Sequence, residues 1–115
     1  MKREIKFRAK ETSGKDWCYG IMHNEGINLF PVSVDMNTIC QFSGMRDKNK
    51  KEIYDGDILK DDYGRIYKVE YQECNAAFML VCYNDRITDY MGYFDTEKYF
   101  EVIGNIYDNK ELLEE

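Results

Sequence analysis

The 115-residue chain is poor in several residue types that define whole classes of protein. It has one proline, Pro31, and one histidine, His23. No stretch approaches the roughly 18 consecutive apolar residues of a membrane-spanning helix, so we expect no membrane partner. The first ten residues, MKREIKFRAK, intersperse charges and lack the apolar run of a signal peptide. We therefore expect the protein to stay in the cytoplasm where it is made.

The cysteines also argue against a metal or disulfide framework. They are Cys18, Cys40, Cys74 and Cys82, and no two of them form a C-x-x-C pair. Close-spaced ligand pairs are typical of structural zinc sites, and His23 alone does not replace them. An even cysteine count suits disulfides in a secreted chain, but this chain has no secretion signal. We expect reduced, buried cysteines that serve packing.

A group of aspartates suggests a divalent-cation loop, but its spacing does not fit one. A calcium loop needs oxygen ligands at alternating positions over twelve residues. Here Ile58 and Leu59 come within the group, and such side chains belong in a core. We favour a tight Asp-Gly turn that feeds a strand. The aspartates concerned are Asp55, Asp57, Asp61 and Asp62.

No catalytic constellation is visible in the sequence. A nucleophile needs a base held beside it, and the pair Cys18 and His23 lies five residues apart with no third group to orient it. Acidic residues are abundant, but nothing singles out a pair for acid–base work. We predict a protein that is not an enzyme and that binds no cofactor.

Aromatic and β-branched residues are plentiful, which favours strands over disorder. Ile5, Phe7 and Ala9 alternate with charged residues, the pattern of a half-buried strand. Strands are predicted at 4–10, 16–22, 27–30, 38–42, 65–73, 76–83, 87–94 and 99–103, with short apolar pairs around the 55–57 turn. The stretch 76–83 is apolar on both faces and should lie inside a sheet.

Short strands at close spacing predict a mainly β fold, as a barrel or a sheet folded on itself. Asp108 and Glu111 have the spacing of a capping box, which predicts a short C-terminal helical turn. No linker or repeat divides the chain, so we expect one domain over residues 1–115.

Three parts of the chain resemble the YopX family of bacteriophage and prophage proteins. They are QFSGMRDKNKKEIYDGDILK at 41–60, YFEVIGNIYDNKELLEE at 99–115, and the opening IKFRAK with Trp17 after it. The resemblance implies a mainly β pseudo-barrel related to small SH3-like barrels, and a bacterial host cell. It brings no catalytic residues. Lys50 stands where such proteins usually have glycine, which enters a left-handed turn more easily, so we expect the loop to differ in shape.

Charge is unevenly distributed along the chain. The net charge is −6, yet residues 1–15 carry six basic and two acidic side chains, and residues 46–51 carry four basic and one acidic. If these segments lie together, they form a basic face that could bind nucleic acid, with aromatic rings for base stacking. Alternatively, the lysines are the solvent side of an edge strand. The candidate contact residues are Lys6, Arg8, Trp17, Arg46, Lys48, Lys50 and Lys51.

The tyrosine content favours a protein partner. Ten tyrosines are too many for every hydroxyl to find a partner inside one small core, so some should lie at the surface. Tyrosine is enriched where protein interfaces gain most of their binding energy. The acidic pI of about 4.9 runs against a nucleic-acid binder. We therefore rank a host or phage protein, or a second copy of this chain, ahead of nucleic acid.

Overall fold

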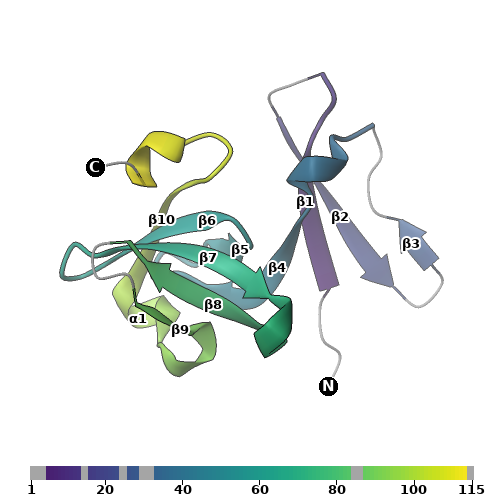
Figure 1. Cartoon of the computed structure of the whole chain (residues 1–115). Helices are drawn as coiled ribbons and strands as arrows, with labels where there is room; N and C mark the ends of the chain where they lie inside the picture. The colour runs from purple at the N-terminus through teal and green to yellow at the C-terminus, as the bar shows by residue number, and fades with distance from the viewer. Residues whose placement is uncertain (1–4, 14–15, 24–25, 29–32, 84–86, 114–115) are drawn as a thin grey trace.

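The part of the chain that the structure describes is built from two five-stranded antiparallel sheets that lie beside each other (Figure 1). The computed structural model describes residues 5–13, 16–23, 26–28, 33–83 and 87–113. Within these residues the mainly β prediction is confirmed, but the two sheets do not close into a barrel. None of the described helices is long and apolar enough to cross a membrane.

The first sheet comes from the N-terminal half of the chain and has the order β3-β2-β1-β4-β5. A regular hairpin joins β1 to β2, from the pair Ile5–Met22 to the pair Lys10–Trp17. By contrast, β1 pairs with β4 only at Phe7–Gln41 and Arg8–Cys40, so the hairpin has little backbone attachment to the rest of the sheet. The strands are β1 (Ile5–Lys10), β2 (Trp17–His23), β3 (Gly26–Asn28), β4 (Cys40–Arg46) and β5 (Glu52–Tyr54).

The second sheet follows in the chain and has the order β10-β6-β7-β8-β9. Its β8 lies between β7 and β9, which confirms the interior position predicted for the apolar stretch. The strands are β6 (Asp57–Asp61), β7 (Ile66–Gln72), β8 (Ala77–Cys82), β9 (Thr88–Tyr90) and β10 (Phe100–Asn105).

The chain passes from one sheet to the other at Asp55 and Gly56. Gly56 has φ +89°, a conformation that glycine adopts without steric cost. Its amide donates to Val69 O at 2.8 Å, so the turn is fastened to the second sheet. The predicted Asp-Gly turn is confirmed.

Short helical turns are found where the sequence pattern predicts a continuous strand. The strand predicted at 87–94 ends at Tyr90, and helical turns occupy most of 91–99. The C-terminal helical turn is confirmed, but the capping box is wrong, because the Asp108 carboxylate bonds Lys10 and Trp17 instead. The helical elements are η1 (Met36–Thr38), η2 (Glu73–Asn75), η3 (Met91–Tyr93), α1 (Thr96–Tyr99) and η4 (Lys110–Leu113).

Two separate apolar clusters hold the sheets. The larger one belongs mainly to the second sheet, where Leu59, Val69 and Leu80 are almost fully buried. The smaller one belongs to the first sheet and consists of Cys40, Phe42 and Tyr54, with Trp17 packed against it. The boundary between the clusters is where the polar contacts described next are concentrated.

Candidate functional site

The three cations of β1 each bind a carboxylate from later in the chain. Lys6 Nζ lies 2.7 Å from Glu52 Oε2, and Lys10 Nζ lies 2.6 Å from Asp108 Oδ1. Between them, Arg8 contacts Asp57 at 2.6 Å. The interpretation of this strand face as its solvent side is therefore wrong: it faces the body of the protein and joins the N-terminal hairpin to it.

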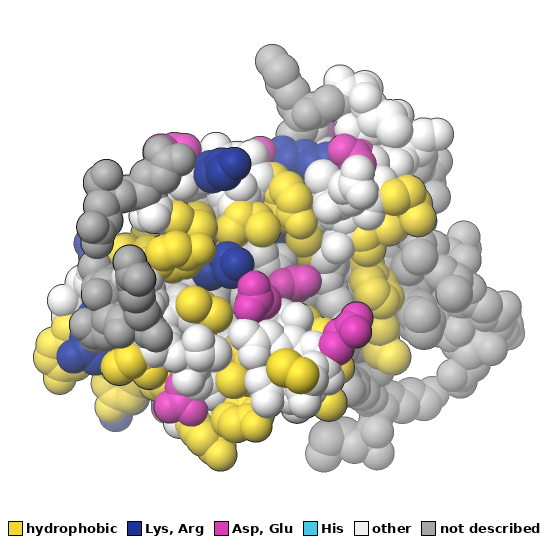
Figure 2. Space-filling view, viewed as in Figure 1, with side chains coloured by type: hydrophobic (Ala, Val, Ile, Leu, Met, Phe, Trp, Pro, Cys, Tyr) yellow, Lys and Arg dark blue, Asp and Glu magenta, His cyan; other side chains and the backbone are white. Residues whose placement is uncertain are grey.

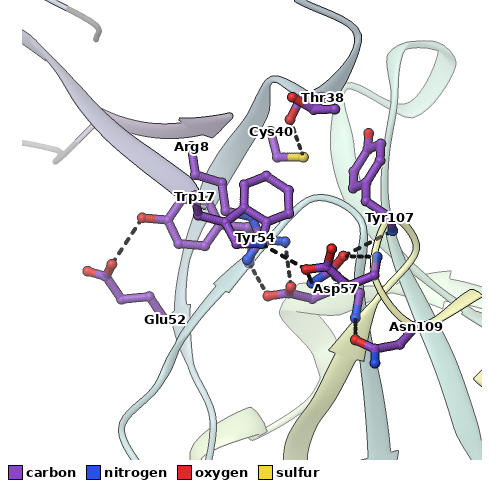
Figure 3. A network of polar contacts seen from close by, with 11 residues as sticks. Arg8, Trp17, Thr38, Cys40, Glu52, Tyr54, Asp57, Tyr107 and Asn109 are labelled. Atoms are coloured by element: carbon purple, nitrogen blue, oxygen red, sulfur yellow. Dashed lines mark hydrogen bonds and ion pairs between the residues drawn. The ribbon is translucent and has the colours of Figure 1, made fainter. Parts of the chain in front are cut away.

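Arg8 is the centre of this joint (Figure 3). The residue is only 5% exposed, and its guanidinium lies between the rings of Trp17 and Tyr54, 4.4 Å and 4.7 Å from their centroids. Asp57 bonds Arg8 through Oδ1 and accepts the Tyr54 amide at Oδ2, 2.8 Å away. Burial works to lower the pKa of Arg8, but the neighbouring Asp57 overrides it and raises that pKa. Arg8 is therefore part of the interior.

Trp17 is likewise engaged within the molecule. Its indole N–H donates to Asp108 Oδ2 at 3.1 Å, and its ring meets Tyr107 edge-on at 5.8 Å between centroids. Partial burial opposes ionisation of Asp108, but hydrogen bonds from Lys10, Asn105 and Trp17 hold its pKa below the ordinary value. The C-terminal segment thus completes the joint that β1 begins.

Cys40, on β4 beside Arg8, does not have the properties of a nucleophile. Burial raises the pKa of its thiol, which donates a hydrogen bond to Thr38 O at 3.2 Å. A protonated, buried thiol is unreactive. Cys18 and Cys82 are also buried and unpaired, as expected, but Cys74 is exposed, so the expectation of burial is wrong there. The side chain of His23 lies outside the described residues.

The predicted basic loop contributes to two different places. Arg46 belongs to β4, and it approaches Glu52 at 3.4 Å, which brings it to the same carboxylate as Lys6. Both cations also lie over the Phe42 ring, at 5.5 Å and 5.6 Å from its centroid. Lys48 and Lys50 turn to carboxylates elsewhere, Asp62 at 3.6 Å and Glu97 at 3.9 Å.

The loop at 46–51 is not simply solvated, because Asp47 is 1% exposed. Its Oδ1 accepts the amides of Asn49 and Lys51, and its Oδ2 accepts the amide of Val102 on β10 at 2.8 Å. The amide of Lys48 also donates to Phe100 O at 3.0 Å. The loop therefore covers the outer edge of β10. An aspartate opening a polar loop often bonds amides two residues on, and this signal could have identified Asp47.

Lys50 adopts the left-handed conformation itself, with φ +68°. Its amide bonds Asp47 O, which closes the turn. Lys50 therefore adopts, at a steric cost, a conformation that glycine adopts freely.

The four aspartates of the acidic stretch do not converge. Asp61 accepts the amides of Tyr63 and Arg65 and the hydroxyl of Tyr67, while Asp57 binds Arg8. Within the described part of the chain, no group of three acidic, cysteine or histidine side chains could hold a metal ion.

Charge is divided between the two halves of the chain. Residues 1–51 carry ten basic and six acidic side chains, whereas residues 52–115 carry six basic and sixteen acidic ones. Six of the ion pairs found among the described residues join a cation of the first half to an anion of the second. Much of the predicted basic face is thus neutralised internally.

Tyrosines, in contrast, are concentrated at the surface, as predicted. Eight of the ten are exposed, and only Tyr54 and Tyr67 are buried. In Figure 2, hydrophobic side chains reach the surface at several places over the second sheet, with acidic side chains between them. The exposed set is Tyr19, Tyr63, Tyr71, Tyr83, Tyr90, Tyr93, Tyr99 and Tyr107.

One apolar hollow of about 420 Å³ lies where η3 meets β8. Met45 and Met91 contribute flexible thioethers, and Phe78 contributes a ring. Tyr90 and Tyr93 form its aromatic side, their ring centroids 5.3 Å apart. Methionine beside aromatic rings gives a surface that adapts to an incoming side chain. The helical turn that sequence reasoning missed is what places Tyr93 here.

These features define a small two-sheet β protein with an internally neutralised basic strand and a tyrosine-rich surface. The family model described as YopX protein matches residues 2–114, and the chain belongs to that family. Comparison with curated proteins gives no match.

Proposed function

We propose that this protein is a phage- or prophage-encoded accessory factor that acts as a non-catalytic protein-interaction module. The observation that carries the proposal is the apolar hollow at η3, bordered by exposed Tyr90 and Tyr93. Aromatic side chains around an apolar depression are typical of the positions where interfaces gain most binding energy. Tyr93 is 75% exposed, so most of its surface is available to a partner.

Nucleic acid binding is the second candidate, and one observation favours it. Lys6 and Arg46 come from distant parts of the chain and meet at Glu52 over Phe42. A phosphate could compete with Glu52 for this pair of cations. The internal ion pairs at Arg8 and Lys10 leave fewer cations for such contacts, which is why a protein partner ranks first.

The test is an affinity pull-down from lysate of the host cell, with and without nuclease and at two salt concentrations. We expect the wild type to capture a protein that stays bound after nuclease treatment, and we expect Tyr93→Ser to lose this captured protein. Tyr83→Ser is the matched control, because Tyr83 is also exposed but does not line the hollow. Mass measurement in solution shows whether the partner is a second copy of the chain.

Two results would overturn this ranking. Recovery of nucleic acid that disappears at higher salt, and with Lys6→Met, would establish the second candidate. Capture that is equal for Tyr93→Ser and Tyr83→Ser would remove the hollow from the interface.

A further inference from the structure

A second hollow, of about 300 Å³, lies between the β6–β7 turn and α1 and has mostly aromatic walls. Five of the eight residues that line it carry aromatic rings. Phe100 packs edge-on against both Tyr67 and Phe94, at 5.3 Å and 5.5 Å between centroids, which makes a rigid floor. Tyr63 and Tyr99 are exposed and form the sides. We call this the aromatic–acidic hollow.

Besides the aromatic rings, two carboxylates and Arg65 line this hollow. Asp61 is fixed by the turn: its Oδ1 accepts the amides of Tyr63 and Arg65, and its Oδ2 accepts the Tyr67 hydroxyl. Asp62 is different, because its side chain is about half exposed and its contact with Lys48 Nζ is long, at 3.6 Å. An exposed ion pair of this kind is held weakly, so another cation can replace it.

Cations of the chain itself already gather here. Arg65 lines the hollow, with its guanidinium 5.8 Å from the centre of the Tyr63 ring, and Lys48 approaches from the β10 edge. Ring faces attract cations through their negative quadrupole, and a carboxylate at the rim adds to that attraction. A neutral apolar side chain would gain from the rings but not from Asp62.

We propose that the aromatic–acidic hollow binds a lysine or arginine side chain of a protein partner. This inference rests on the proposed function and names the chemistry of the partner: a basic segment that places one cationic side chain among Tyr63, Tyr99 and Asp62. The charge of the surrounding chain fits such a partner. Residues 52–115 carry sixteen acidic and six basic side chains, and an acidic excess remains after five of those carboxylates pair with cations of residues 1–51. The apolar hollow at η3 then takes an uncharged side chain of the same partner.

The experiment is an NMR titration of the full chain with three small probes: N-acetyl-lysine amide, N-acetyl-arginine amide and the uncharged N-acetyl-norleucine amide. We expect the two cationic probes to shift the amide signals of Tyr63, Tyr99 and Phe100 in a saturable manner. Norleucine amide should bind at least several-fold more weakly. Raising the salt concentration should weaken only the cationic probes.

Two variants keep the test sharp. Tyr63 is 87% exposed and Asp62 is half exposed, so neither Tyr63→Ala nor Asp62→Asn should impair folding. Each should weaken the lysine probe about two- to five-fold, the range expected of one exposed cation–π contact or ion pair. Tyr83→Ala is the control and should leave the affinity unchanged. Equal shifts by norleucine amide, or unchanged affinity in both variants, would overturn the proposal.

The same variants separate this inference from the proposed function. A partner that the wild type binds and Tyr93→Ser loses, but that Tyr63→Ala and Asp62→Asn both bind with unchanged affinity, would leave the interaction module intact and refute the cation site. A partner affinity that falls about two- to five-fold with Asp62→Asn and is lost with Tyr93→Ser, but is unchanged with Tyr83→Ser, would support both.

Discussion

Replacing Arg8 by methionine should be among the most damaging single changes in this protein. The guanidinium is the only charged partner found for Asp57 among the described residues, and Asp57 is 1% exposed. After the replacement, Asp57 keeps the Tyr54 amide but loses a charge-assisted contact of 2.6 Å. Leaving one partner of a buried ion pair unpaired costs about 3–5 kcal/mol. A domain of this size has a total stability of about 5–15 kcal/mol, so the loss is a large fraction of it.

The assay is urea unfolding followed by circular dichroism, with Arg46→Met as the matched control. Arg46 makes the same kind of contact in a half-exposed position, at 3.4 Å from Glu52, where an ion pair is worth about 0–1 kcal/mol. With an urea m-value of about 1–3 kcal/mol/M, Arg8→Met should lower the midpoint by about 2 M and Arg46→Met by at most about 0.5 M. Equal midpoints for the two variants would refute the buried-pair reasoning.

The dependence on pH provides an independent check. Burial raises the pKa of Asp57, and Arg8 is the strongest influence opposing that rise. Without Arg8, the folded protein holds a proton on Asp57 more readily than the unfolded chain does, so the variant gains stability relative to the wild type as pH falls. The deficit of Arg8→Met should therefore shrink between pH 7 and pH 5. A constant deficit over that interval would contradict an uncompensated carboxylate as its cause.

Three further predictions concern the loop at 46–51 and the alkaline limit. Lys50→Asn should raise stability by about 0.5–1 kcal/mol, because asparagine tolerates φ +68° better than lysine does. Thermal unfolding measures the change, and the control Lys51→Asn should not raise stability. Asp47→Asn places an amide group where a carboxylate accepts three backbone amides, so the variant should lose about 1–3 kcal/mol of stability. Hydrogen exchange of the Val102 amide should become faster, and an unchanged exchange rate would contradict this role of Asp47. Burial, with the bond to Asp61, raises the pKa of Tyr67 to about 12, so the folded state favours the neutral phenol and loses on the order of 2 kcal/mol of stability as pH rises from 10 to 12. Tyr67→Phe should lose less over that range, and parallel unfolding curves for the two proteins would refute this.

Most strands could be predicted because alternation and turn residues are local signals. The strand at Ile5–Lys10 was predicted within one residue, and Ala9 on its apolar face is buried as expected, but the inward packing of its charged face at Arg8 was not predicted. Alternation assigns the charged face to solvent, and here that face meets Glu52, Asp57 and Asp108, which lie far away in the sequence. A pairing between distant charges leaves no periodic signal in either segment.

The residue type of the candidate site could be predicted from the sequence, but its position on the surface could not. A surplus of tyrosine indicates exposed rings, and the structure has them. Their grouping around the two hollows depends on helical turns at 91–99, where the apolar pattern resembles that of a strand. For example, Tyr93 falls within the strand predicted at 87–94, but β9 ends at Tyr90 and Tyr93 lies in the helical turn η3. The secondary structure of such segments is determined by tertiary packing and not by local sequence preference.

The joint around Arg8 has a consequence for the order of folding during synthesis. Its cations belong to β1, whereas its carboxylates follow later in the chain at Glu52, Asp57 and Asp108. The contact between Trp17 and Asp108 spans 91 positions. A nascent chain therefore carries the β1–β2 hairpin until Asp108 is added, 91 positions after Trp17. Long-range closure of this kind slows folding. The hairpin therefore reaches its native packing only when the segment around Asp108 folds back across it.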